Sequence, residues 1–183
     1  MSMPLTLTHH IALARPDLLA APVADALRSL PWADQVHVAE IDPSLADTAQ
    51  FCETYGVALD ESANCVIIAA RRGQDVTYAA CVITAATRAD VNGLVRRHLG
   101  ARKASFGPVD VVTSLTGMEY GGITPIGVPG PWPVLVDDVV ARSSTVVIGS
   151  GIRASKLWLP GYLLASLPGA EALPGLGVQI ASA

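Results

Sequence analysis

The sequence contains little charge, and this sets the first limits on its function. Only 15% of its residues are charged and its formal net charge is −4, which excludes a protein that binds nucleic-acid backbone over its whole surface. We therefore expect no DNA partner, while a small basic patch that touches only an RNA end stays open. The hydrophobic content is 51%, yet no stretch approaches the ~20 uninterrupted apolar residues that span a bilayer. We expect no membrane partner, and the apolar excess favours a dense core that leaves room for a homodimer interface.

Other familiar signals are also missing. The three cysteines, Cys52, Cys65 and Cys81, lie inside apolar segments without metal-ligand spacing, so we expect them to be reduced and buried, and expect no metal site. His9 and His10 interrupt the apolar start that a signal peptide would need, which predicts a cytoplasmic protein. The glycines form neither a P-loop nor a G-x-G-x-x-G motif, which argues against nucleotide triphosphate chemistry, and we expect no cofactor.

Apolar periodicity predicts one α/β domain of the α+β type over residues 1–183. Strands and helices interleave without a strict βαβ rhythm, so we expect a mixed sheet with helices packed around it. The tail after Pro168 is expected to pack loosely. Strands are predicted at 36–41, 64–70, 76–84, 134–136 and 145–148, and helices at 16–27, 44–55, 90–98, 108–115 and 157–167.

The most distinctive stretch is a loop dense in Gly and Pro, residues 116–138, which runs into a short apolar strand. Backbone of this composition has a defined shape, and its N–H groups could line an oxyanion site or belong only to a structural turn cluster. A second glycine loop, residues 148–156, is the natural partner for the other wall of a site. Asp137 and Asp138 end the apolar strand on opposite faces, so we expect Asp138 to form a cap or turn and Asp137 to point into the site.

Three features in order carry a family resemblance. They are the Leu115-Thr116-Gly117 lead followed by Gly121-Gly122-Ile123-Thr124-Pro125, the apolar strand that ends in Asp137, and the turn Gly149-Ser150-Gly151 with Arg153 after it. Through these three features the sequence resembles the YbaK/ProX family of aminoacyl-tRNA editing domains, which are also inserted in bacterial prolyl-tRNA synthetases. The resemblance covers residues 36–167 and leaves 1–35 as an N-terminal extension, which we expect to be a subunit contact or a lid.

The resemblance implies a six- or seven-stranded mixed sheet, partly barrel-like and surrounded by helices. It implies a hydrolase that removes a mischarged amino acid from the 3′ end of tRNA, with water attacking the ester and no metal or covalent nucleophile. The helix at 44–55 would form part of the pocket for the amino-acid side chain. By the same resemblance, Gly121, Gly122, Pro125, Gly149, Ser150 and Gly151 would shape the catalytic site, and Asn64, Thr116, Asp137 and Arg153 would contact the substrate.

Position 64 departs from the family's pattern. The family's central strand begins with a Lys that contacts the substrate, whereas this chain has Asn64, which can donate hydrogen bonds but brings no charge. This departure leaves three possibilities open: a preference for a different acyl group, weak activity, or a protein of the same fold that binds its ligand but no longer hydrolyses it. The alternative function is therefore a non-catalytic or regulatory module that binds an amino acid, an aminoacyl adenosine or a partner protein, and hydrolysis of an unrelated small ester or amide is a third reading.

Overall fold

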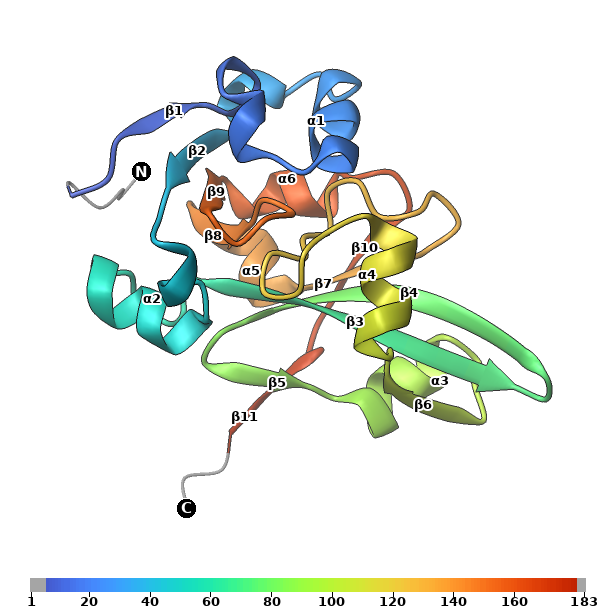
Figure 1. Cartoon of the computed structure of the whole chain (residues 1–183). Helices are drawn as coiled ribbons and strands as arrows, with labels where there is room; N and C mark the ends of the chain where they lie inside the picture. The colour runs from blue at the N-terminus through green and yellow to red at the C-terminus, as the bar shows by residue number, and fades with distance from the viewer. Residues whose placement is uncertain (1–5, 181–183) are drawn as a thin grey trace.

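The computed structural model describes residues 6–180, and these form short helices and eleven strands (Figure 1). The strands are β1 His9–Ile11, β2 His37–Glu40, β3 Ala63–Arg72, β4 Asp75–Thr84, β5 Thr87–Ala89, β6 Lys103–Phe106, β7 Val134–Asp137, β8 Val146–Gly149, β9 Ser155–Leu159, β10 Ala170–Leu173 and β11 Gly177–Gln179. The α-helices are α1 Ala21–Arg28, α2 Thr48–Tyr55, α3 Arg96–His98, α4 Val109–Thr116, α5 Asp138–Arg142 and α6 Gly161–Ala165. Single 3₁₀ turns lie at η1 Ala12–Ala14, η2 Pro16–Leu18, η3 Ala33–Gln35 and η4 Pro43–Leu45, and a π turn, η5, covers Val91–Val95.

The strands divide into a large mixed sheet, a smaller antiparallel sheet and a two-stranded pair (Figure 1). The five-stranded sheet has the order β10-β7-β4-β3-β6, the four-stranded sheet the order β1-β2-β9-β8, and β11 pairs with β5. Strand β7 runs parallel to both of its neighbours, while β4, β3 and β6 are antiparallel to one another. The expected α+β class with a mixed sheet is confirmed, and the strands are divided among three sheets.

The long hairpin of β3 and β4 is the centre of the five-stranded sheet. Its strands pair without a break from Ala63 opposite Thr84 to Arg72 opposite Asp75. Because neighbouring side chains on a strand point to opposite faces, Ile67 packs into one apolar cluster and Ile68 into another. The strand predicted at 64–70 is therefore present, and its continuous apolar run is typical of a strand that is buried on both faces.

Two of the expectations for the C-terminal part are wrong. The predicted helix at 157–167 is instead the buried strand β9, which pairs with both β2 and β8, and only Gly161–Ala165 is helical. A short apolar run fits either a helix or a strand, and here the pairing on both sides decides. The tail is not loose either, because β10 pairs with β7 and Leu176 is fully buried.

The N-terminal residues pack against the second glycine loop. The hydroxyl of Ser155 donates to the Leu18 carbonyl at 2.6 Å, and the Ala20 N–H donates to the Ser150 carbonyl at 3.1 Å. Val23 of α1 is fully buried in the same apolar cluster as β8 and β9. This part of the chain is therefore built into the core. None of the helices in residues 6–180 is long and apolar enough to cross a membrane.

Candidate active site

The two glycine loops lie against each other and are joined through their backbones. The Gly151 N–H donates to the Gly122 carbonyl at 2.7 Å, and the Glu119 N–H donates to the Gly151 carbonyl at 2.8 Å. A Cβ on Gly122 would come within 2.6 Å of the Ile152 backbone, so only glycine allows this approach. The structure thus brings together the loops that the sequence suggested as two walls of one site.

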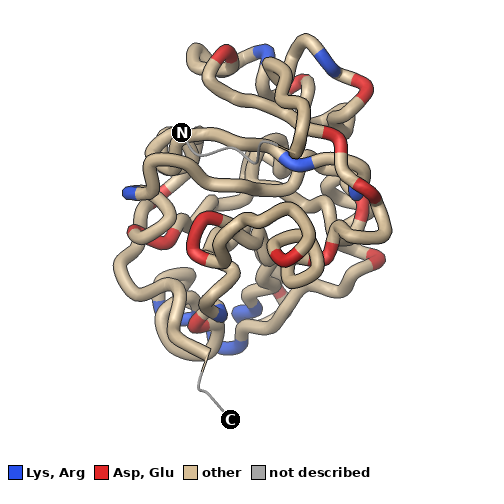
Figure 2. The backbone as a smooth tube through the Cα atoms, turned by 90° about the vertical axis from the view of Figure 1, so that its left-hand side faces the viewer, with Lys and Arg blue, Asp and Glu red and all other residues tan. Residues whose placement is uncertain are grey.

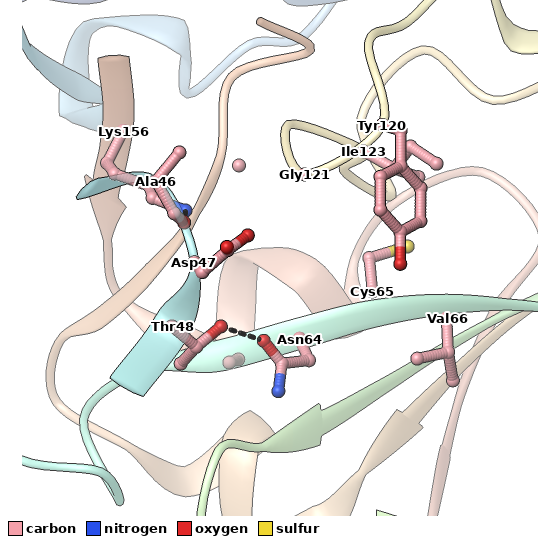
Figure 3. A pocket seen from close by; sticks show the side chains of 12 residues that line it. Ala46, Asp47, Thr48, Asn64, Cys65, Val66, Tyr120, Gly121, Ile123 and Lys156 are labelled. Carbon is pink, nitrogen blue, oxygen red and sulfur yellow. Dashed lines mark hydrogen bonds between the residues drawn. The ribbon is translucent and has the colours of Figure 1, made fainter. Parts of the chain in front are cut away.

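A pocket of about 210 Å³ opens where these loops meet the start of β3 and the start of α2 (Figure 3). Its walls come from four parts of the chain that are far apart in sequence. The helix at 44–55 was expected to form part of such a pocket, and residues from this segment line one side. The lining residues are Ala46, Asp47, Thr48, Ala63, Asn64, Cys65, Val66, Tyr120, Gly121, Ile123, Gly149 and Lys156.

Asn64 occupies the pocket wall formed by β3. Its side-chain oxygen accepts a hydrogen bond from the Thr48 hydroxyl at 2.7 Å (Figure 3). Asp47 lies next to this pair, with its carboxylate 3.5 Å from the Arg153 guanidinium and 66% of its side chain exposed. One side of the pocket therefore offers an amide, a hydroxyl and a carboxylate to a ligand.

Lys156 provides the only cationic side chain among the lining residues. It lies on β9 directly opposite Gly149, is 8% exposed, and donates from Nζ to the Ala46 carbonyl at 3.0 Å. Its Nζ also lies 5.3 Å from the centroid of the Phe51 ring. Burial lowers the pKa of Lys156 to about 8, with Cys52 and Asp47 opposing this change and Arg153 adding to it. The lysine is thus still mostly protonated at neutral pH.

Gly121 contributes its backbone to the pocket. Its φ is +88°, and a Cβ there would overlap the guanidinium of Arg153. Within the described chain, no acceptor takes a hydrogen bond from the Gly121 N–H. This donor is therefore available to a bound molecule.

Arg153 holds the rim of the pocket together. Its guanidinium donates to the Pro43 carbonyl at 3.1 and 3.2 Å and to the Tyr120 carbonyl at 3.4 Å. Its own N–H donates to the Glu119 carboxylate at 2.7 Å. Arg153 was expected to contact the substrate, and such a contact would compete with these internal bonds.

Several residues expected at the site do not line this pocket. Pro125 is buried and lines a second cavity behind the loop. The Ser150 hydroxyl is fully buried 2.7 Å from the Ser155 hydroxyl, and the Thr116 hydroxyl donates to the Val112 carbonyl at 2.8 Å. Together with Gly122 and Gly151, these residues shape the loops from behind rather than from within the pocket.

Asp137 also lies away from the pocket. Its carboxylate accepts from the backbone N–H of Val139 at 2.9 Å and from that of Gly177, which makes Asp137 the N-cap of α5. Burial raises the pKa of this carboxyl group. Asp138 was expected to be the cap, but it follows in the first turn and pairs with Arg142.

Sequence reasoning missed Lys156, Asp47 and Tyr120. Lys156 is one of only two lysines in the chain, and it stands directly before the apolar residues Leu157, Trp158 and Leu159 of β9. Had this run been assigned to a strand, the buried cation would have been a signal. Cys65, expected to be buried, is half-buried and lines the pocket. Between residues 6 and 180, no group of three or more His, Cys, Asp or Glu side chains is arranged to hold a metal ion.

Several solved structures are similar in fold to this chain. A protein described as a candidate trans-editing enzyme for prolyl-tRNA synthetase has 19% identity and a TM-score of 0.72, over 85% of this chain and 94% of that chain. A scaffold used for computational epitope grafting has 20% identity and a TM-score of 0.72, covering 85% and 95%, and the hypothetical protein APE2540 has 21% identity and 0.64, covering 73% and 85%.

These similarities show a shared fold. A comparison with the sequences of curated proteins found no match to the chain. The aminoacyl-tRNA editing domain family matches residues 42–167, which include both glycine loops, α2 and β3, and lie within the 36–167 core expected from the sequence. The chain therefore belongs to the aminoacyl-tRNA editing domain family.

Proposed function

We propose that this editing domain hydrolyses the ester between a mischarged amino acid and the 3′ end of tRNA in the pocket between its two glycine loops and α2. The observation that carries the proposal is the placement of two donors in one small pocket. The buried ammonium of Lys156 comes from β9 and the unpaired N–H of Gly121 from the first glycine loop, and both residues line the same pocket.

The two donors suit the charge that develops in ester hydrolysis. When water attacks the carbonyl carbon, negative charge moves to the carbonyl oxygen. Lys156 and Gly121 stabilise that oxyanion, and donors of this kind, fixed before the reaction, typically contribute about 10²- to 10³-fold in rate each. Burial of the lysine strengthens this effect, because the surroundings screen its charge less than water does.

The other polar groups recognise the rest of the aminoacyl ester. Asp47 is the carboxylate that lines the pocket, so it pairs with the α-ammonium group of the amino acid. Ala46 and Ala63 line the same pocket of about 210 Å³, which favours a small amino-acid side chain. Asn64 and Thr48 already bond to each other and are placed to bond the ribose or the ester.

Water is the attacking group in this proposal because the side chains do not offer an activated nucleophile. Burial and the neighbouring Cys81 raise the pKa of the Cys65 thiol far above its ordinary value, so almost no thiolate is present at neutral pH. The Thr48 hydroxyl donates its hydrogen bond to the Asn64 amide oxygen, and no hydrogen bond in the described part of the chain joins it to a carboxylate or an imidazole. The family resemblance implies that a ribose hydroxyl of the substrate helps the water to attack.

Deacylation of a panel of mischarged tRNAs tests the proposal. We expect purified protein to release one small amino acid from a panel of Ala-tRNA(Pro), Cys-tRNA(Pro), Ser-tRNA(Ala) and Thr-tRNA(Ala) well above the buffer rate. Lys156→Gln should lose most of this activity, whereas Arg142→Gln, which removes an exposed cation on α5, should keep it. If folded wild-type protein left every member of the panel intact, the binding module would replace this proposal. The homodimer stays a prediction, which light scattering would test.

A further inference from the structure

Positive charge is concentrated in one part of this acidic chain. Residues 71–103 contain seven Lys and Arg but two Asp and no Glu, a formal charge of +5, so the rest of the chain carries −9. Six of these cations form what we call the basic surface: Arg71, Arg72, Arg96, Arg97, Arg102 and Lys103. Five are exposed and Arg96 is half-buried. Several Lys and Arg segments lie near one another at the lower end of the molecule in Figure 2, the end that carries α3 and β6 in Figure 1.

Strand pairing brings the basic surface together. Arg71 of β3 lies directly opposite Lys103 of β6, and the Arg102 N–H donates to the Arg71 carbonyl at 2.9 Å. The Arg72 guanidinium reaches to within 3.8 Å of where a Cβ on Gly100 would lie, and the Ala101 N–H donates to the Arg96 carbonyl at 3.0 Å. Two segments of the chain thus place their cations on one end of the sheet.

These cations have no internal counter-ions. Among residues 6–180, the ion pairs involve Arg15, Arg28, His98, Arg142 and Arg153, and none involves a side chain of the basic surface. Exposed cations gathered without partners raise the local potential and attract a polyanion. The charge is therefore available to a partner.

An apolar groove adjoins the pocket and runs along β3 and β6, the strands that carry Arg71 and Lys103. It has a volume of about 320 Å³ and shares Cys65, Val66, Tyr120 and Ile123 with the pocket. Its far wall includes Phe106 of β6, three residues from Lys103 on the same strand. Phe106 is 63% exposed and Tyr120 62%, and exposed aromatic rings are the usual platform on which unpaired bases stack.

The direction of β3 gives the length of this path. Arg71 lies seven residues beyond Asn64, which at about 3.3 Å per residue is about 23 Å. Alternation along the strand places Arg71 on the same face as Cys65 and Ile67, both of which line the groove. The distance exceeds the reach of a terminal nucleotide held in the pocket, so an RNA that contacts both must extend several nucleotides along the groove.

We propose that the groove and the basic surface together form the docking surface for the acceptor end of the tRNA. The unpaired 3′ nucleotides lie along the groove, with bases against Tyr120 and Phe106, and backbone phosphates farther from the ester bind the basic surface. This inference rests on the proposed editing function, since it takes the ester to lie in the pocket. It assigns affinity for tRNA to residues that do not touch the reacting ester.

A double variant with a charge-matched control tests the surface. Arg71→Gln/Lys103→Gln removes two adjacent cations, and Arg28→Gln/Arg142→Gln removes two exposed cations from α1 and α5. For full-length aminoacyl-tRNA, the surface variant should raise KM about tenfold with kcat unchanged, and the slope of log(kcat/KM) against log[salt] should become shallower by about 1 to 2. The control should do neither. Hydrolysis of the same amino acid from aminoacyl-adenosine should be equal in all three proteins.

Binding of uncharged tRNA, followed by fluorescence anisotropy, separates this inference from the proposed function. Weaker binding by the surface variant alone would support the docking surface even if no ester were hydrolysed. Equal loss in both double variants would attribute the effect to net charge, and equal binding by all three proteins would overturn the proposal. Wild-type protein without salt-dependent affinity for tRNA would also overturn it and assign the basic surface to another acidic partner.

Discussion

Replacing Lys156 with methionine should make the protein more stable and much less active. The lysine carries its charge in a buried position, where desolvation lowers its pKa from 10.5 to about 8. Methionine has a similar length and no charge, so Lys156→Met removes this cost and removes the cation from the pocket. A residue that opposes stability while completing a site is expected where function requires it.

The size of the stability change follows from the pKa. The difference between 10.5 and about 8 corresponds to about 3 kcal/mol against the protonated lysine in the folded protein. Loss of the bond to the Ala46 carbonyl costs about 1 kcal/mol, and loss of the contact with the Phe51 ring costs about 0.5 to 1 kcal/mol. We therefore expect Lys156→Met to gain about 1 to 2 kcal/mol at pH 7 and to lose about 10²-fold or more in kcat.

The pH dependence has a definite sign. Below pH 8 the lysine is protonated in both the folded and the unfolded chain, and the folded protein bears the full cost. Between pH 8 and 10.5 the folded lysine is neutral while the unfolded one still binds a proton, so wild-type stability rises with pH relative to Lys156→Met. The charged groups beside Lys156 are Asp47 and Arg153, and the Cys52 thiol, whose pKa burial raises, also faces it.

Urea unfolding of both proteins at pH 7 and pH 9, with hydrolysis rates corrected for the buffer reaction, would measure both effects. The stability difference should narrow at pH 9, and wild-type kcat should fall as the pH rises through about 8. Arg142→Met is the control, because Arg142 is an exposed cation on α5 outside both the pocket and the basic surface. If Lys156→Met were less stable than wild type and equally active, Lys156 would be a structural anchor and the reasoning would be refuted.

Three further changes test other parts of the site. Gly149→Ala should reduce both stability and kcat, because its Cβ would overlap carbonyl oxygens of the opposite loop. Gly130→Ala, whose Cβ would lie in open space, should change neither. Thermal melting followed by circular dichroism would measure stability, and the deacylation assay would measure kcat. In the Lys156→Gln background, Asn64→Lys should restore part of the lost rate, since both side chains line one pocket; no recovery would place Asn64 away from the ester. Asp47→Asn should raise KM for an aminoacyl ester but not for its N-acetylated form, and equal effects on the two would remove Asp47 from recognition of the α-ammonium group.

The parts of the fold that could be predicted are those fixed by local patterns. The continuous apolar run that forms β3 has few alternatives to a strand buried on both faces. Asp90 could be identified as a cap, and its carboxylate accepts from the N–H groups of Gly93 and Leu94. The two glycine loops could be paired because the second follows the next apolar strand after the first. These features depend on residues that lie near one another in the sequence.

The parts that could not be predicted depend on pairing between distant segments. Strand β9 and the C-terminal strands β10 and β11 contain no local signal that outweighs a helix or a loop, and they take their form from β2, β8, β7 and β5. Asp137 fits the same explanation. Its position at the end of a strand suggested a ligand, but the N–H of Gly177, which is forty residues away in sequence, satisfies its carboxylate.

The positive charge in the pocket shows why Asn64, at the position where the family has a lysine, does not by itself decide whether the site is active. Asn64 and Lys156 belong to different sheets, yet both line one pocket because β3 and β9 approach it from separate directions. An ester oxygen responds to the position of a charge and not to the strand that supplies it. Loss of a cation at position 64 therefore predicts loss of hydrolysis only if no other strand reaches the same volume. Lys156 reaches it, so the asparagine that suggested a protein that binds without hydrolysing is compatible with an active hydrolase.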